Sequence, residues 1–143
     1  MNTRHSLAVL AAAGLGLGAT AAAAANVEIT VTDIRESRGT IRMSLCPEAQ
    51  FLKDNCPYSG TAPATVPQAT VVIRNVAPGV YAAQGFHDVN NNGEVDRTLL
   101  GVPEEGVAFS RNPSYFLAPP EFKDAAFTVG PRDTPITVRL RYF

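Results

Sequence analysis

The segment from His87 to Asp96 carries the residue types best suited to hold a metal ion. Counted from Asp88, oxygen-bearing side chains fall at positions 1, 3, 5 and 9, and a glycine stands at position 6. Calcium takes six to eight hard oxygen ligands, and alternate side chains followed by a sharp turn at glycine can wrap around one ion. The candidate ligands are the side chains of Asp88, Asn90, Asn92 and Asp96, together with the backbone carbonyl of Glu94.

The loop departs from an EF-hand in two respects. Position 12 is Leu99, where an EF-hand has a bidentate glutamate, and a strand rather than a helix is expected to enter the loop. We therefore expect a calcium loop on a β scaffold, with His87, Glu104 and Glu105 as further candidate ligands. With two certain carboxylates the affinity should be weak, in the range of roughly 0.1 to 1 mM that extracellular modules use.

Three other interpretations of the same residues stay open. The cluster of Asn and Gly could be a plain turn, because these residues tolerate the left-handed conformation. A transition metal could bind His87 with Asp88 and a glutamate, since imidazole suits zinc or iron. A small metal-dependent or Ser/His hydrolase could use His87, Glu104 and Ser110, although no G-x-S-x-G turn surrounds that serine.

The elements that must position this loop read as strands. Apolar residues alternate with polar ones in residues 27–31 and 41–45, and the short polar segment between them predicts a hairpin. Residues 80–87 form a further strand, in which Tyr81, Ala83 and His87 share one face and Val80, Ala82 and Phe86 the other. No stretch of ten or more residues has a helical stripe.

The remaining segments complete an all-β pattern. Residues 46–69 are rich in Pro, Ala, Thr and Ser and are expected to form a connection, followed by a strand at 71–73. Residues 88–120 are mostly irregular, and two final strands are expected at 125–129 and 136–143. About seven short strands separated by turns predict an antiparallel β-sandwich, immunoglobulin-like or transthyretin-like.

The N-terminus reads as a cleavable secretory signal peptide over residues 1–25. Arg4 precedes an apolar run that is too short and too rich in glycine to span a bilayer, and small residues end the segment. Its removal takes away one basic and no acidic residue, which leaves one domain of 118 residues, 26–143, with a net charge of −2. We expect an exported protein, periplasmic or extracellular, with no transmembrane segment after cleavage.

The expected export of the chain determines the redox state that we predict for its two cysteines. Cys46 and Cys56 both lie in the mature part, where thiols are oxidised, and their spacing fits no zinc site. We expect a disulfide that closes a short loop and contributes roughly 3 kcal/mol. No basic stripe exists, so nucleic acid and anionic lipid are not expected as partners; a cell-envelope protein or polysaccharide remains open.

A resemblance to a known family rests on an ordered set of motifs. These are V-A-P-G-V-Y at 76–81, G-F-H-D-V-N-N-N-G-E-V-D at 85–96, G-V-P-E-E-G at 101–106, and Phe109-Ser110. Together they resemble the domain of unknown function 2141 family of secreted bacterial proteins. The resemblance implies a signal peptide followed by one small β-sandwich domain, and no established activity. The P-G-x-Y turn at 78–81 is also similar to that of transthyretin-like and collagen-adhesin repeat domains.

These observations predict an exported, non-enzymatic β-sandwich module with a weak calcium loop and a binding or structural role in the envelope. The hydrolase built on His87, Glu104 and Ser110 is the alternative. The two hypotheses differ in one observable way, because a hydrolase needs these side chains to converge on one pocket.

Overall fold

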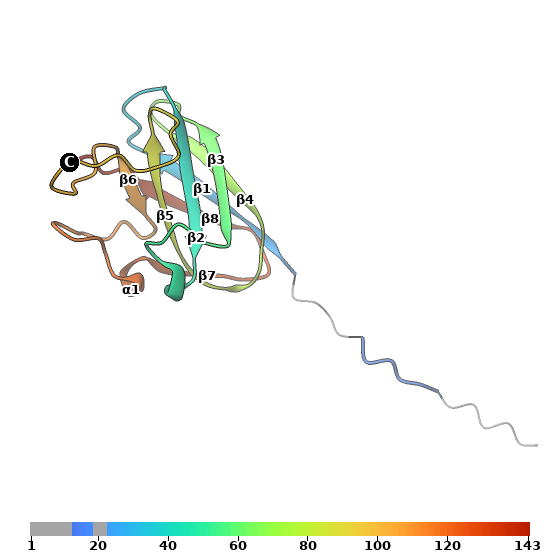
Figure 1. Ribbon diagram of the computed structural model, residues 1–143. Helices are drawn as coiled ribbons and strands as arrows, with labels where there is room; N and C mark the ends of the chain where they lie inside the picture. Colours follow the sequence, from blue (N-terminus) through green and yellow to red (C-terminus); the bar gives the residue numbers. More distant parts are fainter. Residues whose placement is uncertain (1–12, 19–22) are drawn as a thin grey trace, which may run out of the picture.

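The fold is a two-layer β-sandwich, as the alternation of apolar and polar residues predicts. The computed structural model describes residues 13–18 and 23–143, so most of the expected signal peptide lies outside the described residues. Eight strands form one sheet of three and one of five (Figure 1). Strand β1 begins at Ala25, next to the expected domain boundary. Within the described residues, no helix has the length and apolarity needed to cross a bilayer.

The three-stranded sheet has the order β4-β1-β8. It consists of β1 (Ala25–Thr32), β4 (Ala69–Val76) and β8 (Thr134–Arg139). Strand β4 is antiparallel to β1, whereas β8 is parallel to it, with Ile29 opposite Ile136. This parallel pair is the one departure from the expected antiparallel pattern among the described strands.

The five-stranded sheet carries the candidate site. Its order is β3-β2-β5-β6, from β3 (Tyr58–Pro63), β2 (Thr40–Cys46), β5 (Gly79–Asp88) and β6 (Val107–Phe109). Strand β7 (Ala126–Val129) pairs with the first half of β5, and β6 pairs with the second half. All these pairs are antiparallel. The long strand β5 is therefore the spine of this sheet.

The core lies between the sheets, and a second cluster covers the outer side of β5. The main core contains the inward-facing residues of β1, β2, β4 and β8, together with Tyr81 and Ala83 from β5. Ala82 belongs to the second cluster, against which Phe86 packs. The predicted division of β5 into two faces is thus confirmed. Short elements η1 (Glu48–Gln50) and α1 (Phe122–Ala125) flank the second cluster, which includes Phe51 and Ala125.

The predicted hairpin between residues 27–31 and 41–45 is wrong. Strands β1 and β2 lie in different sheets, because the segment between them crosses the edge of the sandwich. Asp33 has a φ of 62°, and the buried Ile34 donates its N–H to the carbonyl of Pro67 on the way. Period-two alternation says which face of a strand is buried, but both sheets bury their inner face, so alternation does not identify the pairing partner.

Residues 46–69 also hold more structure than expected. The disulfide between Cys46 and Cys56 is present, as predicted, with the two Cα atoms 4.8 Å apart. A disulfide is compatible with an oxidising compartment. Strand β3 follows the disulfide and differs from the connection that the sequence predicts. It is an edge strand that pairs with β2, and its residues alternate between half-buried and exposed. It has no large aliphatic side chains, so its sequence shows no clear apolar alternation.

Candidate functional site

The candidate site is the loop that leaves the end of β5 and returns to the sheet at β6. Asp88, the last residue of β5, has a fully buried side chain. Its Oδ2 accepts hydrogen bonds from Arg42 Nε at 2.6 Å and from the Gly93 N–H at 2.9 Å, and its Oδ1 accepts from the Asn92 N–H at 3.1 Å. One carboxylate therefore ties the middle of the loop to the neighbouring strand β2.

Glu105 closes the loop from its other end. It is buried to 6 % exposure, and its two oxygens accept the N–H of Val89 at 3.0 Å and the N–H of Asp96 at 3.2 Å. These two amides stand at the beginning and at the end of the loop. Glu105 was a candidate metal ligand, but both its oxygens serve as a brace that holds the loop ends together. The adjacent Glu104 is exposed and points its side chain to solvent.

Three of the predicted ligands converge at the open side of the loop. The Nδ2 atoms of Asn90 and Asn92 lie 2.7 and 2.8 Å from the two carboxylate oxygens of Asp96. The Oδ1 atoms of the same asparagines accept the N–H groups of residues two positions later, Asn92 and Glu94. These are Asx turns of the kind that the plain-turn interpretation expects.

The described residues do not bring three His, Cys, Asp or Glu side chains together at a single metal-sized position. Glu94 is exposed, and its backbone carbonyl remains its candidate contribution. A cation in this loop would therefore depend on asparagine oxygens and backbone carbonyls beside Asp96 and Asp88. Hard oxygens of this type suit Ca2+ rather than zinc, which favours nitrogen and sulfur ligands.

His87 faces away from the loop, into the sandwich. Its Nε2 lies 2.6 Å from the Arg38 carbonyl oxygen, which can only accept, so this nitrogen carries the proton. Its Nδ1 then accepts from the hydroxyl of Tyr142 at 3.3 Å, and that hydroxyl also receives the Arg35 N–H. The side chain is fully buried and joins the crossing segment after β1 to the C-terminus.

Ser110 lies too far from His87 to form a catalytic pair with it. The buried Ser110 hydroxyl donates to the Ala125 carbonyl and accepts the Ala83 N–H at 2.8 Å. Ala83 and His87 are four residues apart on one strand, which corresponds to about 13 Å. His87, Glu104 and Ser110 therefore do not converge, and the serine links β5 to the segment that precedes β7.

The sequence did not indicate Arg42 as part of the site. It lies on the polar face of β2, where an exposed arginine is ordinary. Its register opposite Phe86 places its guanidinium diagonally across from Asp88. A single charged residue on a strand gives no sign of its partner until the strand pairing is known.

The electrostatics of Asp88 give the site a pH dependence. Burial alone would raise the pKa of the Asp88 carboxyl, but the hydrogen bond and charge of Arg42 and the N–H groups of Gly93 and Asn92 together lower it below its ordinary value. The carboxylate form is therefore the one that the folded loop stabilises.

We expect the stability from Asp88 to be present above its unfolded pKa of about 3.9 and to be lost as the pH falls through its lower folded pKa. Urea unfolding between pH 6 and pH 2.5 should show the midpoint falling in that window. Asp88→Asn should show a shallower fall over the same range, as should Arg42→Gln. Equal pH slopes for wild type and Asp88→Asn would contradict this assignment.

The brace made by Glu105 can be tested against its exposed neighbour. Glu105→Gln replaces one acceptor oxygen by an NH2 group, which leaves a half-buried backbone N–H without a partner and should cost about 1–3 kcal/mol. Glu104→Gln is the matched control and should change the free energy of unfolding by less than about 0.5 kcal/mol. Urea unfolding measures both, and similar values for the two variants would show that Glu105 is no brace.

The motif residues at 76–96 and 101–110 lie around β5, the loop after it and β6. The family model described as "Uncharacterized protein conserved in bacteria (DUF2141)" matches residues 29–137, from β1 into β8. No curated protein and no solved structure matches the chain. The match spans both sheets, the loop and its buried brace. The chain belongs to this bacterial family of uncharacterised proteins, DUF2141.

Proposed function

We propose that the chain is an exported, non-enzymatic β-sandwich module whose loop from Asp88 to Asp96 binds Ca2+ weakly. It would act in binding or in structure at the cell envelope. Export is supported by the signal-like order of residues 1–25 and by a disulfide that suits an oxidising compartment. A non-enzymatic role is supported by the separation of His87 from Ser110, whose polar atoms serve the fold.

The observation that carries the calcium proposal is the convergence of Asn90, Asn92 and Asp96. The side-chain NH2 groups of Asn90 and Asn92 each donate to one oxygen of the Asp96 carboxylate. A bound cation would take the place of these two NH2 groups at the carboxylate. Each asparagine Oδ1 accepts one backbone N–H and keeps a second lone pair for a metal. Asp88 Oδ1 has the same spare capacity, because it accepts only the Asn92 N–H.

The brace explains why a weak donor set could still bind. Glu105 and Asp88 hold the loop backbone in place without metal, so little conformational entropy is lost when the ion enters. The number of free charges limits the affinity. Of the two carboxylates among the proposed side-chain ligands, Asp88 is already paired with Arg42, and only Asp96 has no cation partner within the described residues.

Calcium should stabilise the protein and protect the loop. Arg97 is the single Lys or Arg between residues 75 and 110, so trypsin cleavage there reports loop opening. Roughly 5 mM Ca2+ should slow this cleavage and raise the melting temperature. The free energy of unfolding should increase by about 1 kcal/mol if the Kd is near 1 mM. Asp96→Asn should lose both effects, and Asp54→Asn, on the disulfide loop, should keep them.

Magnesium at the same concentration serves as the ionic-strength control. It should have a smaller effect, because Mg2+ demands a tighter octahedral shell and gives up its water reluctantly. If 5 mM Ca2+ leaves both the melting temperature and the cleavage at Arg97 unchanged, the loop is only a turn and the proposal is wrong.

A further inference from the structure

Large apolar side chains are exposed to solvent on the side of the domain that carries the end of the Asp88–Asp96 loop and the C-terminus. Leu99 and Leu100 are 107 % and 92 % exposed, and Leu117, Phe116 and Phe143 are 93 %, 75 % and 53 % exposed. Figure 1 shows the turn after the loop, the segment following β6 and the C-terminus on the same side of the molecule. We name these five residues the apolar tip. Large exposed apolar side chains that gather on one side of a domain are typical of an interaction surface.

A hydrogen-bonded turn keeps the side chains of Leu99 and Leu100 exposed to solvent. The Gly101 N–H donates to the Thr98 carbonyl at 2.9 Å, and the Thr98 N–H donates to the Val102 carbonyl at 2.9 Å. Gly101 has a φ of 81°, which favours glycine, and Arg97 binds its carbonyl at 3.0 Å. Leu99 and Leu100 are the central residues of this β-turn, so they point outward and cannot fold back onto the core.

The other part of the tip is joined to the same underlying cluster. Val95, just before the turn, and Tyr115, just before Phe116, both pack against the second core cluster. The ring of Phe143 lies 6.1 Å from that of Tyr115, and the Arg141 guanidinium lies over both rings at 5.5 and 5.0 Å. The segments that carry the tip residues are therefore anchored to the second core cluster through Val95 and Tyr115.

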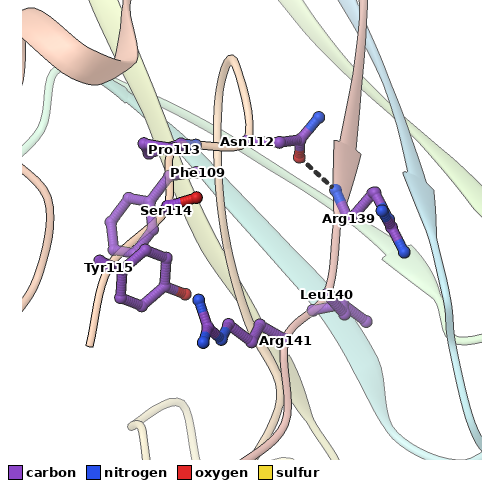
Figure 2. A pocket seen from close by; sticks show the side chains of 8 residues that line it. All are labelled: Phe109, Asn112, Pro113, Ser114, Tyr115, Arg139, Leu140 and Arg141. Atoms are coloured by element: carbon purple, nitrogen blue, oxygen red, sulfur yellow. Dashed lines mark hydrogen bonds between the residues drawn. The ribbon is translucent and has the colours of Figure 1, made fainter. Parts of the chain in front are cut away.

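A polar pocket of about 260 Å3 opens beside the tip. Asn112, Ser114, Tyr115 and Arg141 contribute its polar side chains, together with Arg139, and no acidic residue lines it. Figure 2 shows the hydroxyl of Tyr115 and the guanidinium of Arg141 close to each other, whereas the guanidinium of Arg139 is directed away. Arg139 is paired with Asp33 at 3.0 Å, but Arg141 has no carboxylate partner within the described residues.

One polar atom of the pocket, the Tyr115 hydroxyl, has no hydrogen-bond partner in the part of the chain that the structure describes. Within the described residues, the Tyr115 hydroxyl is the one buried side-chain polar atom without a hydrogen-bond partner. Burial raises the pKa of this hydroxyl, although the charge of Arg141 acts in the opposite direction, so it stays a proton donor. A guanidinium and a hydroxyl side by side, both with free donors, suit an oxygen anion such as a phosphate.

We propose that this side of the domain docks onto a phospholipid bilayer, with the apolar tip in the boundary between headgroups and acyl chains and a lipid phosphate in the pocket of Tyr115 and Arg141. The leucines protrude from a turn, and a protruding tip fits a soft lipid surface without needing a matching groove. Aromatic rings and an arginine behind an apolar edge are the arrangement of an interfacial anchor. The proposal stands apart from the calcium proposal and uses none of its ligands.

Charge attraction does not drive this docking. The mature domain has a net charge of −2, and the sequence carries no basic stripe that would attract an anionic surface. The phosphate that the pocket recognises is present in zwitterionic lipids as well. We therefore expect binding to phosphatidylcholine vesicles, with no gain when phosphatidylglycerol is added.

The chain contains no tryptophan, which allows a single reporter at the tip. Leu100→Trp in the full chain should show a blue shift of emission with phosphatidylcholine vesicles and quenching by brominated phosphatidylcholine. The matched control is Val80→Trp, because Val80 is 53 % exposed and lies eight residues from Asp88, about 26 Å along β5. It should show neither effect, even if the N-terminal segment associates with the vesicle.

Two further variants test the pocket in the Leu100→Trp background. Arg141→Gln or Tyr115→Phe should weaken vesicle binding by about tenfold, as expected for a lost hydrogen bond to a charged group. Arg139→Gln should change it by less than about twofold, since an exposed ion pair contributes little. Inorganic phosphate at millimolar concentration should compete only slightly, because it cannot engage the tip.

Three results would overturn the proposal. The first is an unshifted Leu100→Trp emission at saturating vesicle concentration. The second is a blue shift that depends on protein concentration without lipid, with a dimer in sedimentation, because a second copy would then cover the tip. The third is equal vesicle binding by the Arg141→Gln and Arg139→Gln variants, because Arg141 would then not bind a lipid phosphate.

Discussion

Two buried carboxylates determine how the far end of the five-stranded sheet is built. A carboxylate taken out of water must be paired or hydrogen-bonded, because an isolated buried charge is very costly. Asp88 meets this requirement with Arg42 and two loop amides, and Glu105 meets it with the first and last amides of the same loop. The irregular chain after β5 is therefore a tied loop whose backbone donors have defined partners.

This constraint leads from the fold to the surface chemistry. Because the loop backbone is fixed from inside, the side chains of Asn90, Asn92 and Asp96 are left to face one another on the open side. The turn that presents Leu99 and Leu100 follows directly, and its base is joined to the loop by the Glu104 N–H, which donates to the Asp96 carbonyl at 2.8 Å. His87 and Ser110 use their polar atoms for hydrogen bonds within the fold.

Some of this could be predicted from the sequence, because local patterns record burial and turns. The period of two identified the sandwich and the two faces of β5, and the expectation of export led to the prediction of the disulfide. The partner of each strand could not be predicted, since β1 and β2 bury the same kind of face in different sheets. The oxygen spacing of the loop located the candidate site, but it gave no sign that Glu105, a possible further ligand, accepts backbone N–H groups at both ends of the loop.

The roles of Arg42 and Glu105 depend on contacts that are distant in sequence. Arg42 reaches Asp88 only because β2 and β5 pair in a given register, and Glu105 reaches Val89 only because the chain returns to the end of β5. Amide hydrogen exchange of Val89 and Asp96, measured by NMR without calcium, tests this account most directly. We expect both amides to be protected nearly as well as the central amides of β5. Exchange of either amide at the rate of an unstructured peptide would contradict the account, because the loop would then not be held by its buried carboxylates.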